Sequence, residues 1–229
     1  MYSFRNDYSE GAHPRVLQAL VDTNLTQTCG YGVDPICDEA RALIRTLCAA
    51  PDAAIHFLVG GTQTNMTVIT ALLASYEAVI AAHTGHVNCH ETGAIEATGH
   101  KVCTAYSPDG KVTPEMVESV LAIHADGEEH MVAPKLVYIS DTTEIGTVYT
   151  KAELTALRQC CDAHDLLLFL DGARLGSALT SPENDLTLSD LAALTDVFTI
   201  GGTKNGALFG EAVIMTVPCD HFRWLPRNI

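Results

Sequence analysis

The stretch LLLFLDGAR, residues 166–174, runs through five apolar residues and ends on an acidic one, Asp171. A continuous apolar run followed by glycine is typical of a strand that is buried on both faces of a parallel sheet. A carboxylate at the end of such a strand costs free energy unless it has a partner. Arg174 offers a structural ion pair. The functional alternative is that Asp171 holds a protonated ring nitrogen of a ligand, while Arg174 binds ligand oxygens.

Six other apolar runs resemble this one, and segments of helical periodicity lie between them. The predicted strands are 54–59, 78–82, 101–106, 135–140, 166–171, 196–201 and 211–216. The predicted helices are 35–49, 62–75, 87–98, 114–125 and 151–164. This alternation predicts an α/β fold with a mostly parallel seven-stranded sheet and helices on both faces. Residues 1–34 differ and are expected to form an arm and loops.

Composition argues against several classes of protein. The chain has 229 residues and a formal net charge of −15, which disfavours a broad surface for nucleic acid or anionic lipid. Its longest apolar region, 66–82, is interrupted by Ser75, Tyr76 and Glu77, so we expect a helix and a strand there rather than a membrane span. Eight cysteines without a C-x-x-C pair, and no signal peptide, indicate reduced thiols in a cytoplasmic protein.

Ligands of such sheets bind beyond the carboxyl ends of the strands, and a glycine pair follows the first predicted strand. The motif is VGGTQTN, residues 59–65, in which Gly60 and Gly61 allow close backbone approach and Thr62 is a candidate helix cap. Free amides at the start of a helix favour an anion such as phosphate. The alternative is an ordinary strand-to-helix turn with a threonine cap.

A lone lysine follows another predicted strand, in IGGTKNGALFG, residues 200–210. Lys204 is either a surface lysine on a tight turn or an amine that forms a Schiff base with a carbonyl cofactor. Its glycine neighbours leave room for a planar ring. A phosphate cradle, a carboxylate for a ring nitrogen and a lysine, all on one rim of a sheet, are what pyridoxal 5′-phosphate requires.

Three histidines lie close together in HTGHVNCHETGAIE, residues 83–96. On a helix, His83, His86 and His90 would share a face, which suits a metal ion. Two alternatives stay open from the residues alone. One imidazole stacks on a cofactor ring, or the segment is a polar helix start whose histidines are satisfied locally.

Six motifs in a fixed order carry a resemblance to a known family, and together they cover nearly all of residues 3–217. They are FRNDYSEGAHP, YGVDP, GGTQTN, GHVNCHETGAIEATGHKV, DGARLGSAL and GGTKNGALFGEAVI. The chain resembles the low-specificity threonine aldolases of the aromatic amino acid β-eliminating lyase/threonine aldolase family. These are fold-type-I enzymes that use pyridoxal 5′-phosphate. The resemblance implies that residues 35–217 form the cofactor-binding large domain.

The resemblance also implies how the cofactor is held. Lys204 would form the Schiff base, and Gly61 and Thr62 would bind the phosphate. His86 would stack on the pyridine ring, which makes it a candidate for both cofactor binding and catalysis. Asp171 would pair with the ring nitrogen.

Four further residues are implied on the substrate side. Arg174 would lie near the ring hydroxyl and the substrate carboxylate. Asn6 stands where the family usually has a serine that contacts this carboxylate, and Tyr31 matches a tyrosine near the site, from the same or a neighbouring subunit. His130 falls near a family histidine that faces the substrate side chain. The catalytic base is then His86, His130 or a bound water.

The implied reaction is retro-aldol cleavage of a β-hydroxy-α-amino acid, with threonine or allo-threonine giving glycine and acetaldehyde. A homo-oligomer, dimer or tetramer, is expected. The alternatives are a β-eliminating lyase, a non-catalytic chain that binds the cofactor, and a metal-dependent hydrolase built on His83, His86 and His90. A nucleotide-binding oxidoreductase is disfavoured because no strand-to-helix turn carries G-x-G-x-x-G.

The family continues beyond the last residue of this sequence with a smaller α/β domain that carries an arginine for the substrate carboxylate. Residues 218–229, VPCDHFRWLPRNI from Val217 onward, do not match that continuation. We therefore expect a chain without its small domain and with an atypical tail. Such a chain would keep the main cofactor contacts and lose activity, because the carboxylate clamp that orients the substrate is incomplete.

Overall fold

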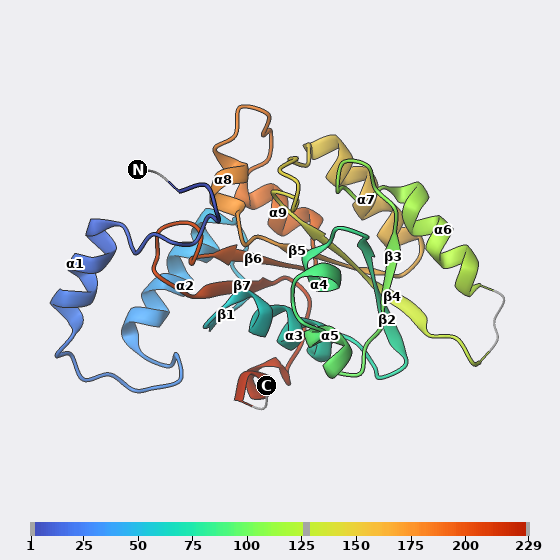
Figure 1. Ribbon diagram of the computed structural model, residues 1–229. Helices are drawn as coiled ribbons and strands as arrows, with labels where there is room; N and C mark the ends of the chain where they lie inside the picture. The colour runs from blue at the N-terminus through green and yellow to red at the C-terminus, as the bar shows by residue number, and fades with distance from the viewer. Residues whose placement is uncertain (1–2, 126–128, 228–229) are drawn as a thin grey trace.

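A seven-stranded sheet forms the centre of the molecule in the computed structural model, which describes residues 3–125 and 129–227. The strand order is β1-β7-β6-β5-β4-β2-β3 (Figure 1). The strands are β1 (Ala54–Leu58), β2 (Glu77–Ala82), β3 (Val102–Ala105), β4 (Ala133–Ser140), β5 (Leu167–Asp171), β6 (Val197–Gly201) and β7 (Glu211–Met215). β7 is antiparallel to both neighbours, whereas the other pairs are parallel. The predicted strands and the mostly parallel sheet are confirmed.

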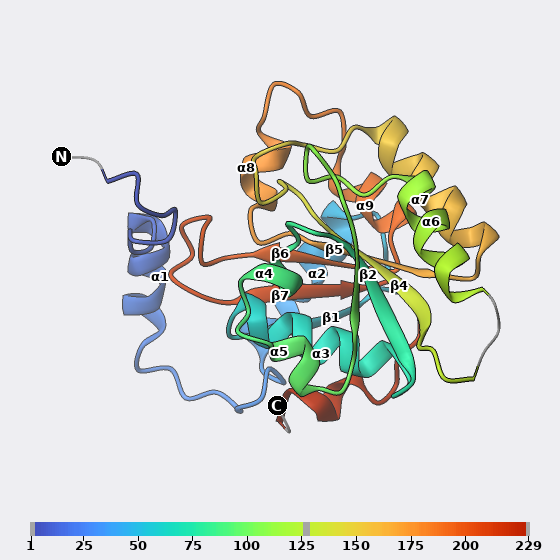
Figure 2. The ribbon, with the colours of Figure 1, turned by 45° about the vertical axis from the view of Figure 1, so that its right-hand side comes forward.

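Helices cover both faces of this sheet, as predicted (Figures 1 and 2). One layer contains α2 (Pro35–Leu47), α6 (Pro114–His124), α7 (Lys151–Ala163), α8 (Leu175–Leu179) and α9 (Leu188–Leu194). The other contains α3 (Gly61–Leu72), α4 (His86–Cys89), α5 (Ala94–Ala97) and the 3-10 helix η1 (Phe222–Arg227). Among the described residues, no helix is both long enough and apolar enough to cross a lipid bilayer.

Strand β5 shows why the apolar run that ends at Asp171 is continuous. Leu168 and Leu170 are fully buried in the core beneath the α6–α7 layer, whereas Phe169, between them, is fully buried in the core beneath α3. Alternate side chains of a strand point to opposite faces, so a sheet covered on both sides needs an apolar residue at every position.

The single helix predicted over 87–98 is wrong, because the structure has two short helices there. α4 ends at Cys89 and α5 begins at Ala94. Between them Thr92 and Gly93 have φ values of 56° and 74°. Backbone in this left-handed region cannot continue a right-handed helix, so the chain turns sharply between α4 and α5.

The arm predicted over 1–34 contains a helix that sequence reasoning missed. This helix, α1 (Pro14–Thr23), begins with Pro14 at its first position, and the His13 side chain accepts a hydrogen bond from the amide of Arg15. None of its ten residues, all of them described, is buried. It projects from the body of the molecule (Figure 2). The short helices α8, α9 and η1 were also not predicted, since five to seven residues give little periodicity.

The tail after β7 packs against α3. Phe222 is fully buried, and its ring centroid lies 4.5 Å from that of His56. The His221 imidazole lies within hydrogen-bonding distance, 2.8 Å, of the Ala71 carbonyl oxygen. The described part of the tail therefore packs against α3 and β1, on the face of the sheet that α3 covers.

Replacing Phe222 by alanine should lower the free energy of unfolding by about 3 kcal/mol, because a fully buried aromatic side chain is removed and leaves a cavity. Urea unfolding curves measure this. Phe4→Ala, at a position whose side chain is almost fully exposed, is the control and should change the value by less than about 0.5 kcal/mol. Equal effects of the two changes would contradict the packing of the tail.

Candidate active site

The carboxylate of Asp171 is buried at the carboxyl end of β5 and accepts three hydrogen bonds. Its Oδ2 accepts from the Asn65 side chain at 2.9 Å and from the Tyr138 hydroxyl at 2.6 Å. Its Oδ1 accepts from the amide of Ala173 at 2.9 Å. The guanidinium of Arg174 donates instead to the carboxylate of Asp7. The interpretation of a structural Asp–Arg pair is therefore wrong.

Tyr138 and Asn65 were not singled out from the sequence. Burial, and then the Asp171 carboxylate, raise the pKa of Tyr138 well above its usual value, so its hydroxyl stays protonated and donates. Asn65 also donates to Glu91 Oε1 at 2.7 Å. Each residue has a weak signal in the sequence. Tyr138 is a phenol inside an apolar strand, and Asn65 is an amide one helical turn after the glycine pair.

His86 joins this network through Glu91. Its Nδ1 lies 2.9 Å from Glu91 Oε1, and the Glu91 side chain is 0% exposed. The hydrogen bond to Glu91 raises the pKa of His86 above its usual value, and this outweighs burial, which lowers it. The second oxygen of Glu91 is buried without a hydrogen-bond partner among the described residues.

A second acidic side chain fixes the backbone of His86. The amide of His86 donates to Glu144 Oε1 at 2.9 Å, and the Ser140 hydroxyl donates to the same oxygen at 2.6 Å. The small cavity of about 10 Å³ beside these groups is lined by His86, Ser140, Thr142, Glu144, Asp171, Ala173 and Arg174. Side chains around it must move to admit a ligand larger than water.

The three histidines of the 83–96 motif do not converge on one point. His83 Nδ1 accepts a hydrogen bond from the amide of Ser107 at 3.1 Å, and its ring stacks on Tyr106. The rings of His86 and His90 are 5.5 Å apart, centroid to centroid. In the described part of the chain, the one group with ligand atoms close enough for a metal contains none of them. The structure thus contradicts a metal-dependent hydrolase built on these histidines.

The loop that carries Lys204 is fixed between two other strand ends. The Asn205 side chain donates to the carbonyl oxygens of Ala173 and Gly201, at 3.1 and 2.8 Å. The amide of Gly210 donates to Val59 O, the residue before the glycine pair, at 3.1 Å. Lys204 therefore lies between the Asp171 turn and the start of α3, and its charge lowers the pKa of His86 in opposition to Glu91.

The start of α3 is open, and the predicted threonine cap is wrong. Gly60 is the N-cap with extended backbone, no side chain caps this helix within the described residues, and Thr62 lies inside its first turn. A Cβ added at Gly60 or Gly61 would meet no described atom within 4 Å. Uncapped amides, the positive end of the helix dipole and open space suit an anion.

The N-terminal arm crosses the site. Arg174 donates two hydrogen bonds to Asp7, from Nε and, at 3.1 Å, from Nη2. The Lys204 ammonium lies 5.9 Å from the centre of the Tyr8 ring. Asn6 is adjacent to Asp7, and its side chain accepts hydrogen bonds from Tyr8 N and, at 2.6 Å, from Ser9 Oγ. The arm thus brings Asp7, which the sequence did not single out, to Arg174, and the substrate-side role of its neighbour Asn6 stays a prediction.

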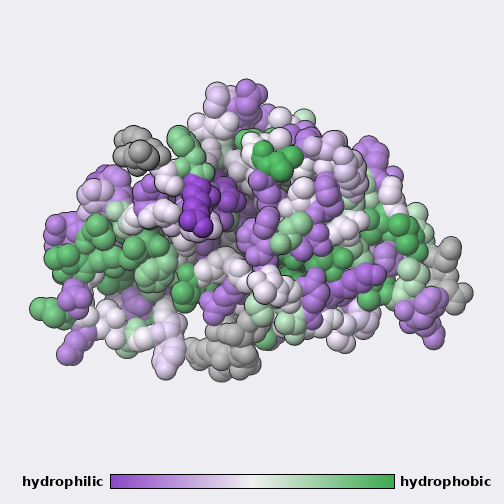
Figure 3. Space-filling model, viewed as in Figure 1, coloured by the Kyte–Doolittle hydropathy of each residue, from purple (hydrophilic) through white to green (hydrophobic). Residues whose placement is uncertain are grey.

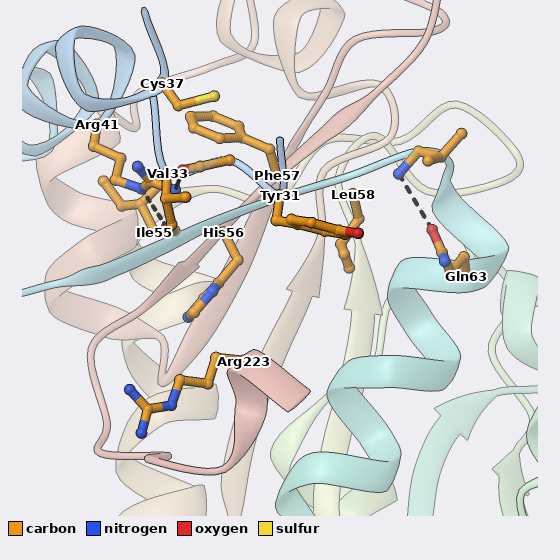
Figure 4. A pocket seen from close by; sticks show the side chains of 12 residues that line it. Tyr31, Val33, Cys37, Arg41, Ile55, His56, Phe57, Leu58, Gln63 and Arg223 are labelled. Atoms are coloured by element: carbon orange, nitrogen blue, oxygen red, sulfur yellow. Dashed lines mark hydrogen bonds between the residues drawn. The ribbon is translucent and has the colours of Figure 1, made fainter. Parts of the chain in front are cut away.

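Two predicted residues are not brought to this cluster within the chain. His130 lies in the turn before β4, at the amino ends of the parallel strands, whereas Asp171 and Lys204 follow their carboxyl ends. Tyr31 lines a separate cavity of about 720 Å³ beside β1, together with His56, Phe57 and Arg223 (Figure 4). The prediction that His130 faces the substrate is therefore wrong if the site is built from a single chain.

Glu211 is an unpredicted acidic residue near Lys204. It begins β7, is 5% exposed, and lies opposite Leu58 on one side and Gly201 on the other. Burial, and then the charge of Asp171, raise its pKa to about 8, although Lys204 acts in the opposite direction. Its carboxyl group is therefore mostly protonated at neutral pH. Its sequence signal is an acidic residue at the head of an apolar strand.

Comparisons with known proteins match most of the chain. Residues 5–217 match the beta-eliminating lyase family. The chain belongs to this family. Low specificity L-threonine aldolases of Pseudomonas aeruginosa and of a Pseudomonas species are 33% and 35% identical to it over 92% of the chain and 61% of their own length. The chain thus spans about three-fifths of these curated relatives.

Solved structures of the family and its neighbours share the fold. A Leishmania major threonine aldolase structure has a TM-score of 0.93 and 55% identity, and the match covers 100% of this chain and 66% of that one. A Thermus thermophilus aspartate aminotransferase has a TM-score of 0.74 at 18% identity and covers 96% of this chain, which supports a common fold only. The fold predicted from the resemblance is confirmed, including its relation to fold-type-I proteins.

Replacing Glu91 by glutamine should lower the pKa of His86, because the carboxylate that favours the imidazolium is removed. An NMR titration of the His86 ring proton measures this. Glu96→Gln, at an exposed position on α5, is the control and should leave the titration unchanged. An unchanged His86 pKa in Glu91→Gln would contradict the assigned pair.

The same pair predicts how stability depends on pH. Because the pKa of His86 is raised in the folded protein, its contribution is fully present below the unfolded value of about 6.5 and is lost as pH rises through the folded pKa. The loss of unfolding free energy in Glu91→Gln, measured by urea unfolding, should therefore be larger at pH 5.5 than at pH 9.

Proposed function

We propose that this chain is the cofactor-binding part of a pyridoxal-phosphate-dependent lyase that cleaves β-hydroxy-α-amino acids. Threonine or allo-threonine would give glycine and acetaldehyde. The observation that carries this proposal is the convergence of Lys204, Asp171, His86 and the uncapped start of α3 on one rim of the sheet. The names of the Pseudomonas and Leishmania relatives supply the substrate class.

The residues present fit pyridoxal 5′-phosphate by their chemistry. Asp171 supplies a buried carboxylate for a protonated ring nitrogen, and Gly61 and Thr62 lie in the uncapped first turn of α3, where a phosphate is favoured. Lys204 would hold the aldehyde carbon covalently, and His86 would lie against the ring. When bound, the cofactor supplies an electron sink for the bond that breaks.

Arg174 is proposed to bind the substrate carboxylate. Its guanidinium already makes two hydrogen bonds to the carboxylate of Asp7, which is the geometry that a substrate carboxylate would use. The substrate must then replace Asp7 or share Arg174 with it. Asn6, on the same arm, would contact the substrate from this side, and Tyr31 remains a proposed contact at an interface between subunits.

His86 is the proposed base or proton carrier that this chain supplies. Glu91 holds Nδ1, so Nε2 is the nitrogen that is left to accept a proton from the β-hydroxyl group or from a water beside it. The raised pKa of His86 implies that this acceptor becomes available as the pH rises through that pKa.

We also propose a homo-oligomer, dimer or tetramer, in the cytoplasm. Apolar side chains on the projecting helix α1, among them Leu17, Leu20 and Val21, are exposed and gather on one side of the molecule (Figure 3). A surface of this kind suits contact with another subunit. All eight cysteines are free thiols, which suits a reducing compartment.

Acetaldehyde release from threonine, with pyridoxal 5′-phosphate added, tests the proposal. We expect release by the unchanged chain, none by Lys204→Ala, and a fall of about 100-fold or more in Asp171→Asn, because the ring nitrogen loses its anionic partner. Lys135→Ala, which removes an ion pair with Asp165 at the amino ends of β4 and β5, away from the rim, should retain activity.

Other outcomes separate the alternatives. A visible absorption band of bound cofactor in the unchanged chain but not in Lys204→Ala, without acetaldehyde, would mean that the chain binds the cofactor and does not turn over. Release of ammonia and a keto acid would favour β-elimination. Neither band nor product would contradict the proposal.

A further inference from the structure

A cysteine, a histidine and a glutamate converge on the outer surface of the α6–α7 layer, away from the rim that carries Lys204. Cys160 lies on α7, His164 is the C-cap of that helix, and Glu118 lies on α6. One ligand atom from each, the thiol sulfur, an imidazole nitrogen and a carboxylate oxygen, lies within 4.8 Å of the other two. No part of the proposed lyase site uses these residues.

Local structure explains why the three side chains meet. Cys160 and His164 are four residues apart, so they share one face at the end of α7. α6 packs beside α7, and the Cys160 thiol lies 3.9 Å from the carbonyl oxygen of Pro114, in the first turn of α6. Glu118 is one turn further along α6. Two helices therefore fix the spacing between the ligands.

The surroundings suit a cation. Cys160 is 8% exposed, whereas Glu118 and His164 reach solvent, so the thiol forms the floor of an open site. The Glu118 carboxylate lies beside the thiol, and a divalent cation bound between them would stabilise the thiolate.

We propose that Glu118, Cys160 and His164 form a zinc-binding site that joins α6 to α7. Thiolate, imidazole and carboxylate are the ligands that Zn²⁺ takes in proteins, and a tetrahedral ion leaves a fourth position for water. Binding replaces the thiol proton by the ion, and the proton passes to solvent. The site stabilises the layer and takes no part in the proposed lyase chemistry.

Competition for Zn²⁺ with a chromogenic chelator tests the site, on reduced chain in which the exposed Cys29 and Cys89 are replaced by serine throughout. We expect one ion per chain. His164→Ala and Glu118→Gln should each weaken binding by about 10-fold or more, and Cys160→Ala by about 100-fold. Cys161→Ala and Asp162→Asn, the adjacent thiol and an adjacent surface carboxylate, are matched controls that should bind as the parent does.

Two further readouts keep the test decisive if Cys160→Ala folds poorly. Co²⁺ should give a thiolate-to-cobalt absorption band in the parent without added cofactor. His164→Ala, a substitution at an exposed position, should weaken this band. Zn²⁺ at a hundredfold excess over its dissociation constant should raise the parent melting temperature by about 5 °C and that of His164→Ala by much less. Absence of ion binding, or equal binding in the parent and His164→Ala, would overturn the site.

Discussion

The hydrogen bonds to the Asp171 carboxylate join three separate parts of the fold at one point. Asn65 comes from α3, Tyr138 from β4 and the Ala173 amide from the turn after β5. A buried carboxylate is tolerated only when its oxygens are satisfied, so the start of α3 and the ends of two strands must meet here. The positions of the other groups on the rim follow from this requirement.

The network extends from Asp171 in two directions. Through Asn65 and Glu91 the network reaches His86. The contact between Glu91 and Nδ1 orients the imidazole and leaves Nε2 for a ligand. On the other side, Asn205 ties the loop of Lys204 to the turn after Asp171. These groups are held by one another, so the rim has much of its geometry without a ligand. Preorganisation of this kind is what a lyase site needs.

The sheet could be predicted from the sequence because every strand buried on both faces leaves an apolar run. Asp171 could be singled out because a carboxylate at the end of such a run is costly, and Lys204 because it is a lone lysine among glycines after another strand. Their partners could not, since Asn65 meets Asp171 across 106 residues and no local pattern encodes such a contact. The break after α4 depends on the left-handed backbone of Thr92 and Gly93. The role of His130 came from the resemblance alone, and the turn that carries it lies before β4, at the other end of the strands.

The most direct test of the central claim, that this rim holds pyridoxal 5′-phosphate through Lys204, is to identify the lysine that carries the cofactor. Borohydride reduction of the chain mixed with the cofactor, followed by mass mapping of its peptides, would locate a reduced covalent bond. We expect one modified residue, Lys204, in the peptide that contains GGTKNG. Modification spread over exposed lysines such as Lys151, with none at Lys204, would contradict it.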